Sequence, residues 1–102
     1  MAMFNPAHPG ELIRETIEAI REETGKSLTV TEVADNLQTT RKNLSAIINC
    51  KQSISPEMAL KLAAAFRNTT PEFWLRAQNN YDLALARNNV SVKEIKALWK
   101  AA

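Results

Sequence analysis

Two adjacent cationic side chains, Arg41 and Lys42, stand in the first turn of a predicted helix. A helix N-terminus already carries partial positive charge, so helix stability alone would favour Asp or Glu there. The two cations therefore predict an anionic partner. Asn43, Ser45 and Ala46 follow them, and these residue types can contact base edges in the DNA major groove. The stretch predicts contact with double-stranded DNA.

Such side chains need a rigid support, and residues 29–49 predict one. Thr29 and Glu32 form a T-x-x-E capping box, which begins a helix. Gln38-Thr39 is long enough only for a turn, and Thr40 is a good N-cap for a second helix. The pattern is a helix-turn-helix whose second helix would dock in the major groove. The candidate DNA-binding residues are Thr29, Thr31, Thr39, Thr40, Arg41, Lys42, Asn43, Ser45, Ala46 and Lys51.

The alternative is a solvated helix face in a small bundle, and an isolated basic turn would favour it. The charge distribution argues against this alternative. Residues 1–40 hold seven acids and three bases, a net charge of −4, whereas residues 41–102 hold four acids and ten bases, a net charge of +6. The basic excess begins at Arg41, which suits a protein with one surface for phosphates and another for a different partner.

The whole chain, residues 1–102, is expected to be one all-α domain, because no stretch alternates apolar and polar residues as a strand does. We expect a five-helix bundle with a short sixth helix at the C-terminal end. Beyond the helix-turn-helix, helix starts are predicted at Pro9, at Ser55-Pro56-Glu57, at Thr70-Pro71-Glu72 and at the capping box Ser91-Val92-Lys93-Glu94.

The C-terminal helices, residues 70–100, carry more large apolar side chains than the end of a small monomer can easily bury. We expect them to form a homodimer interface. In the alternative, Trp74 and Trp99 cover the far end of the bundle within one chain. The candidate dimerisation residues are Phe73, Trp74, Ala77, Tyr81, Leu85 and Trp99.

Catalytic and metal-binding chemistry has little to build on in this sequence. His8 is the one histidine and Cys50 the one cysteine; a zinc site wants about four ligands, and Cys50 has no histidine nearby in the chain to activate it. We expect no enzyme activity, no metal and no cofactor. A lone cysteine, no apolar run long enough for a membrane and no signal-peptide pattern indicate a cytoplasmic protein without a membrane partner.

The first predicted helix has a strongly acidic outer face, which includes Glu15, Glu18 and Glu22. Such faces are usually just solvated. The alternative is a docking surface for a basic partner protein, since opposite charges speed association.

Taken together, these features resemble the HigA-type antitoxins, a branch of the repressor-like helix-turn-helix proteins. The resemblance covers nearly the whole chain and is specific in order and spacing. Its markers are His8-Pro9-Gly10-Glu11, the helix-turn-helix from Thr29 to Asn49, the run Ser55-Pro56-Glu57-Met58-Ala59-Leu60-Lys61-Leu62-Ala63, Thr70-Pro71-Glu72-Phe73-Trp74-Leu75, and Gln78-Asn79-Asn80-Tyr81-Asp82-Leu83.

The resemblance implies a homodimer that binds an inverted-repeat operator in its own promoter. It also implies a tight complex with a small basic HigB-type toxin, an RNase that cleaves mRNA at the ribosome. By position, Thr40, Arg41, Lys42 and Ala46 match base-facing or first-turn residues of this class, while residues 29–31, Asn43 and Lys51 match positions near phosphates. A stand-alone repressor without a toxin is the alternative function, and a helical protein-interaction module that does not touch DNA is a third.

Two positions depart from the family pattern. The family usually has glycine in the turn, where this chain has Gln38, and after the second helix, where it has Cys50. Gln38 is expected to adopt a left-handed or strained conformation that glycine would adopt more easily. Glycine is the favoured residue after a helix C-terminus, so Cys50 leaves the path of the chain to Lys51 open.

Overall fold

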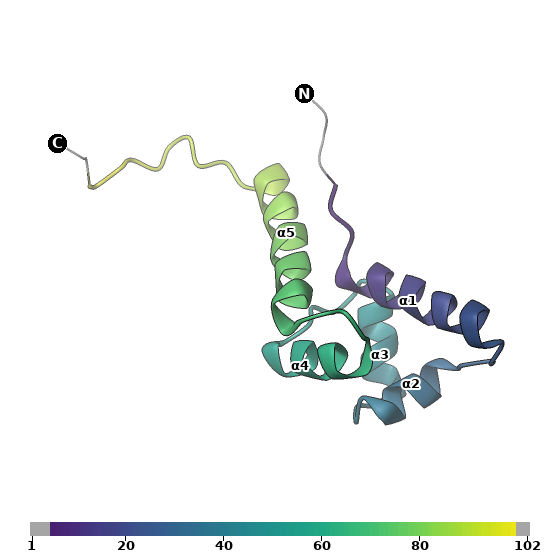
Figure 1. The fold of residues 1–102 in the computed structure, drawn as a ribbon. Coiled ribbons are helices and arrows are strands. Elements are labelled where there is room, and N and C mark those ends of the chain that lie inside the picture. Colours follow the sequence, from purple (N-terminus) through teal and green to yellow (C-terminus); the bar gives the residue numbers. More distant parts are fainter. Residues whose placement is uncertain (1–4, 100–102) are drawn as a thin grey trace.

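The computed structural model describes residues 5–99, and the regular structure in that part of the chain is entirely helical (Figure 1). This confirms the all-α prediction and its five main helices. They are α1 (Pro9–Thr24), α2 (Val30–Asn36), α3 (Arg41–Ile48), α4 (Pro56–Ala65) and α5 (Pro71–Asn89).

Each helix begins at a residue whose side chain accepts a hydrogen bond from a backbone N–H of the first turn. This satisfies one of the donors that every helix N-terminus leaves unpaired. Proline occupies the start of α1, α4 and α5, where its missing N–H costs nothing. The five capping residues are His8, Thr29, Thr40, Ser55 and Thr70. The helix starts predicted at Pro9, Thr29, Thr40, Ser55 and Thr70 are therefore confirmed.

The core lies where α1 and α2 pack on α3 and where α4 packs on α5. Ile13, Leu44 and Leu62 are fully buried there. At Gly10 the two backbones come so close that a Cβ atom would lie 1.9 Å from the carbonyl oxygen of Ile47. Only glycine permits this approach, which sets the start of α1 against the end of α3.

The first half of α5 is joined to the rest of the bundle by buried polar groups. The Gln78 side chain accepts a hydrogen bond from the Ile54 backbone N–H at 3.0 Å. His8 accepts one from the Gly10 N–H through Nδ1 at 2.9 Å, and its ring meets that of Tyr81 edge-on, 4.8 Å between centroids. Burial lowers the pKa of His8, although Asp82 and Glu11 oppose the shift.

Trp74 departs from the dimerisation prediction. Its side chain is only 1% exposed and packs against Phe66 and Phe73 within the same chain. It belongs to the core of the bundle, as the alternative interpretation held for this residue, and it is not available to a second copy.

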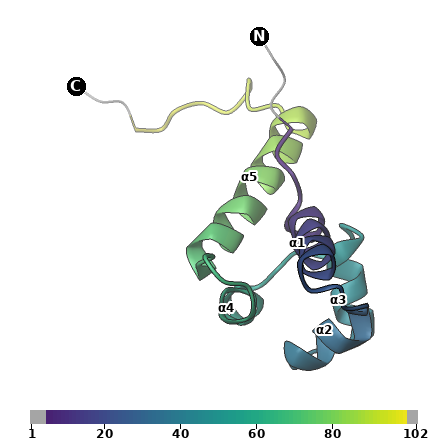
Figure 2. The same ribbon diagram turned by 45° about the vertical axis from the view of Figure 1, so that its right-hand side comes forward.

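The predicted short sixth helix is absent from residues 90–99. A single turn forms there, with Ile95 N–H bonded to the Val92 carbonyl at 3.1 Å, and the chain otherwise runs away from the bundle without regular structure (Figures 1 and 2). The physical reason is that a short helix is marginal without packing of its apolar face. Here Val92, Ile95, Leu98 and Trp99 stay exposed and pack against no other part of residues 5–99.

Candidate nucleic-acid interface

The helix-turn-helix is built on a reciprocal capping box at the start of α2. The Thr29 N–H donates to Glu32 Oε1 at 2.9 Å, and the Glu32 N–H donates to Thr29 Oγ1 at 3.1 Å. The Glu32 carboxylate accepts from the Thr29 N–H and also from Thr29 Oγ1, at 3.1 Å, and these two hydrogen bonds lower the pKa of Glu32 because they favour its charged form. Thr29 and Thr31, both predicted to lie near phosphates, are exposed at this end of α2.

The helix α3 has one buried face and one open face. Leu44, Ile47 and Ile48 face the core. On the opposite face Lys42, Ala46 and Asn49 recur one turn apart, as i, i+4 and i+7 positions do. Lys42 and Asn49 are exposed and Ala46 is half-buried, so this row faces solvent.

Arg41 and Lys42 are both exposed, and within residues 5–99 neither side chain takes part in a hydrogen bond or an ion pair. The one ion pair in that part of the chain joins Lys61 to Glu57 at 3.4 Å, on α4. Two uncompensated cations thus stand at the N-terminal end of α3, where the helix dipole makes the local potential still more positive. The arrangement suits an anion.

Asn43 is held on one flank of this row. Its amide nitrogen donates to Thr39 Oγ1 at 2.8 Å, and its amide oxygen accepts from the Gln52 side chain. The turn, the helix and the following loop are thereby linked through one carboxamide whose orientation is set at both ends. Sequence reasoning named Thr39 and Asn43 but missed Gln52, since no local pattern marks a contact nine residues away.

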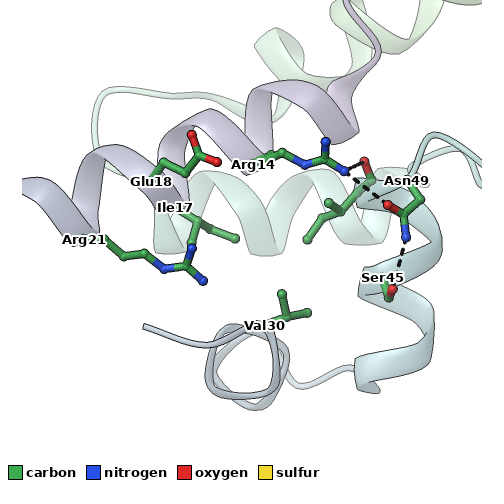
Figure 3. Close-up of a pocket in the computed structure, with 8 residues that line it drawn as sticks. Arg14, Ile17, Glu18, Arg21, Val30, Ser45 and Asn49 are labelled. Carbon is green, nitrogen blue, oxygen red and sulfur yellow. Dashed lines mark hydrogen bonds between the residues drawn. The ribbon is translucent and has the colours of Figure 1, made fainter. Parts of the chain in front are cut away.

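Asn49 is held on the other flank by a residue of α1. Arg14 donates to Asn49 Oδ1 at 3.1 Å and to the Ile48 carbonyl at 3.4 Å, and Asn49 Nδ2 donates to Ser45 Oγ at 3.3 Å (Figure 3). Arg14 therefore satisfies backbone at the C-terminal end of α3 and orients the Asn49 amide. Arg14 was not among the predicted site residues, because the sequence does not show that α1 lies beside the end of α3.

A cavity of about 300 Å³ adjoins this flank, between α1, α2 and α3. Arg14 and Arg21 extend along its edge from α1, and Ile17, Val30 and Ile48 contribute apolar walls (Figure 3). Since Val30 begins α2 and the cavity also includes Ser45 and Asn49, the start of α2 lies beside the open face of α3. The structure thus brings the two predicted groups of DNA-binding residues to neighbouring positions.

Both ends of α3 are bounded by a residue in the left-handed region. Gln38 has φ 56° and Cys50 has φ 62°. Each closes the preceding helix with the paired hydrogen bonds of a Schellman motif, Gln38 and Thr39 to carbonyls of α2, and Cys50 and Lys51 to carbonyls of α3. The left-handed conformation predicted for Gln38 is confirmed, and the hydrogen bonds of Cys50 and Lys51 give the chain a regular path after α3.

The turn before α3 is supported from α4. Lys61 Nζ donates to the Gln38 carbonyl at 3.2 Å while it pairs with Glu57.

Burial raises the pKa of the Cys50 thiol, so this side chain stays protonated at neutral pH. Among the described residues, no group of three or more His, Cys, Asp or Glu side chains is arranged to hold a metal ion.

Residues 17–74 match the model of a helix-turn-helix family, and this region includes α2, the turn and α3. The chain belongs to the helix-turn-helix family. Virulence-associated protein A′ of Dichelobacter nodosus is 43% identical to it over 98 residues, which cover 96% of this chain and 79% of the relative.

Two solved structures sharpen this family assignment. An addiction module antidote protein of the HigA family from Coxiella burnetii superposes with a TM-score of 0.79 at 30% identity, covering 94% of this chain and 100% of that one. The Pseudomonas aeruginosa antitoxin HigA, solved with the higBA promoter, gives a TM-score of 0.73 at 28% identity, covering 93% and 100%. The resemblance to HigA-type antitoxins is confirmed, and this helix-turn-helix protein is one of a family of DNA-binding antitoxins and transcription regulators.

Among residues 5–99, none of the helices is both long enough and apolar enough to span a lipid bilayer.

Proposed function

We propose that this helix-turn-helix protein is a cytoplasmic antitoxin that works in two ways. As a dimer it binds an inverted-repeat operator in its own promoter and represses the operon. As a partner it binds and neutralises a small basic HigB-type RNase toxin. The observation that carries the DNA part is the open, uncompensated pair Arg41 and Lys42 on a helix whose opposite face is buried.

The geometry of α3 supports the following proposed roles on DNA. Lys42, Ala46 and Asn49 form the row that enters the major groove, with lysine suited to guanine and alanine to the thymine methyl. Arg41 and Thr40 contact bases or phosphates at the start of α3, and Thr29, Thr31 and Lys51 contact phosphates on either side. Asn43 reaches the DNA from the flank while Gln52 and Thr39 hold it in place.

The DNA proposal is tested with Arg41→Ala and Lys42→Ala, separately and together. A lost base contact should cost ~1–3 kcal/mol in operator binding, and a lost phosphate contact should reduce the salt slope by roughly one. The matched control removes two exposed cations elsewhere, Arg67→Ala with Arg76→Ala. Titrations at several salt concentrations decide the matter, and operator binding by the Arg41/Lys42 double variant that equals wild type would contradict the assignment.

The dimer is proposed to form through the outer side of α5. Phe73 and Leu85 are exposed there, while Ala77 and Tyr81 are half-buried. In a two-fold dimer the two copies of α3 should lie about one DNA turn apart, ~34 Å. Sedimentation of the full chain tests this, since a monomer at tens of micromolar would exclude it.

The toxin part rests on the HigA-type resemblance and on the charge of α1. Arg14 and Arg21, which could have paired with the neighbouring glutamates, bond instead to carbonyl groups of residues 48 and 28. Glu15, Glu18 and Glu22 therefore stay exposed and uncompensated among the described residues. A basic toxin is the partner that this face complements.

Co-expression with the product of a small basic open reading frame beside the gene tests the toxin part directly. The expected result is a stable complex and loss of toxicity. If the neighbouring product neither co-purifies nor becomes harmless, while operator binding persists, the protein is a stand-alone repressor. Charge reversal of Glu15, Glu18 and Glu22 to lysine should slow toxin association at low salt, and an unchanged association rate would exclude this face.

A further inference from the structure

Residues 90–99, which we call the C-terminal arm, carry apolar side chains that the rest of the chain does not cover. Val90, Val92, Ile95 and Leu98 are all exposed, and Trp99 is 89% exposed. In two views turned by 45° the arm leaves the end of α5 and extends away from the bundle (Figures 1 and 2). An apolar segment held away from its own protein indicates that another surface covers it.

The solvent-accessible area of the chain is larger than that of a compact monomer of the same mass. The surface is 7963 Å², whereas a compact monomer of 11.4 kDa is expected to expose about 5,800 Å². The radius of gyration is 17.2 Å, against about 13 Å for a compact chain of this length. The excess of roughly 2,200 Å² is more than the ~800 Å² that each partner contributes to an interface of standard size.

A surface able to receive an apolar segment lies on the same chain, at the C-terminal half of α5. A small cavity of about 80 Å³ opens there between the N-terminal segment and α5. It is lined by Asn5, Pro6, Tyr81, Ala84, Leu85 and Asn88. Tyr81 and Leu85 are also on the proposed dimer face, so this cavity continues that face rather than forming a separate site.

We propose that in the dimer each arm crosses to the other copy and packs along that copy's α5 and into its small cavity. The inference rests on the proposed dimer. Ten extended residues span up to ~33 Å, and a helix of the length of α5, 19 residues, spans about 28 Å, so the arm can follow the partner helix along its length. Because one chain carries both the arm and the receiving surface, a two-fold axis satisfies both contacts twice.

The charge of the arm favours a second copy of this chain as its partner over the basic toxin. The arm carries Lys93, Glu94 and Lys96, a net charge of +1, which would oppose contact with a basic toxin. The C-terminal half of α5 is close to neutral, since it has Asp82 and Arg87.

Sedimentation equilibrium and tryptophan fluorescence test the exchange on the full chain. The apolar variant, Leu98→Ser with Trp99→Ser, should raise the dimer dissociation constant about tenfold or more, as loss of a buried aromatic anchor does. The matched control, Lys93→Ser with Lys96→Ser, changes two residues of the same arm and should leave the constant unchanged. Circular dichroism should show the same helix content in both variants.

Fluorescence reports on the arm itself, because Trp74 is buried at all times. Trp99 emission should move to shorter wavelength as concentration passes through the monomer–dimer transition, and Trp99→Phe should lose that change. A dimer with an unaltered dissociation constant in the apolar variant would overturn the exchange but leave the dimer. A Trp99 shift at all concentrations would place the arm on its own chain, and a shift only on adding toxin would assign it to the toxin; either result overturns the exchange. A chain that stays monomeric overturns the dimer and the exchange together.

Discussion

The helix-turn-helix segment, residues 29–51, and the C-terminal arm, residues 90–99, stand in contrast. The first has apolar residues buried in the core, a cap at each helix start and a Schellman motif at each helix end. The arm also begins with a capping serine, whose Oγ accepts a 3.4 Å hydrogen bond from the Lys93 N–H, yet only a single turn follows. Its apolar residues are exposed.

The difference teaches that capping starts a helix but packing maintains it. Thr40 and Ser91 are both plausible N-caps by sequence. After Thr40, α3 places Leu44, Ile47 and Ile48 against α1 and α2, and this burial offsets the entropy of ordering the helix. After Ser91 the apolar residues of the arm pack against none of the other described residues, so the same local signal produces one turn.

The largest expected effect compares one leucine from each region. Leu44→Ala should lower the free energy of unfolding by about 2–5 kcal/mol, because it opens a cavity in the core. Leu98→Ala should change it by less than about 0.5 kcal/mol in the monomer, as an exposed substitution does. Urea unfolding at concentrations below the dimer transition measures both. Equal losses would remove the contrast between the regions.

Gly10→Ala should cost about 1–3 kcal/mol, since its Cβ would overlap the Ile47 carbonyl and push α1 away from α3. Gly25→Ala is the control. Nothing lies within 4 Å of a Cβ there, and only the positive φ of 68° opposes the change. Thermal unfolding followed by circular dichroism separates them, and a larger loss at Gly25 would contradict the close approach at Gly10.

Arg14→Ala should weaken operator binding by ~1.5 kcal/mol, because Asn49 loses the charged donor that orients its amide. Arg14→Gln, which can still donate, should recover part of this loss. Competition titrations with operators altered at single base pairs provide the readout. If Arg14 only stabilises the fold, all operators will weaken equally; if it orients Asn49, discrimination at one base pair will fall.

Cys50→Gly should stabilise the protein by about 1 kcal/mol, because glycine removes the cost of a left-handed non-glycine residue at φ 62°. Gln38→Gly should do the same at φ 56°. The control is Cys50→Ala, which keeps a Cβ and should gain nothing. Chemical denaturation measures the free energy of unfolding of each variant. A lower value for Cys50→Gly would mean that packing of the thiol stabilises the protein more than relief of the left-handed backbone does.

The smallest effect concerns pH and the junction between the bundle and α5. Burial lowers the pKa of His8 in the folded chain, so below its ordinary pKa near 6.5 the unfolded chain binds more protons. The contribution of neutral His8 to the free energy of unfolding is therefore fully present above about pH 6.5. It is lost as pH falls through the lowered pKa of His8 in the folded chain. His8→Asn keeps a capping acceptor and should flatten this part of the stability profile; an unchanged slope would exclude His8 as its source.

Features set by neighbouring residues could be predicted, and features set by tertiary contact could not. The caps at Thr29, Thr40, Ser55 and Thr70 depend on three or four consecutive residues, so the sequence predicts them. The Arg14–Asn49 contact joins residues 35 apart, and nothing local marks it. Burial of Trp74 was equally hidden, since an aromatic stripe on a helix reads the same whether its partner is the same chain or another.

Lys61 limits how freely residues 29–51 can be exchanged between relatives. Its amine, on α4, holds the carbonyl of Gln38 in the turn that leads into α3. Grafting residues 29–51 from a relative, in order to change which operator is bound, would leave this donor facing a different turn. A transplant that keeps the new specificity must therefore include a compatible residue at position 61, which lies outside the segment proposed to contact DNA.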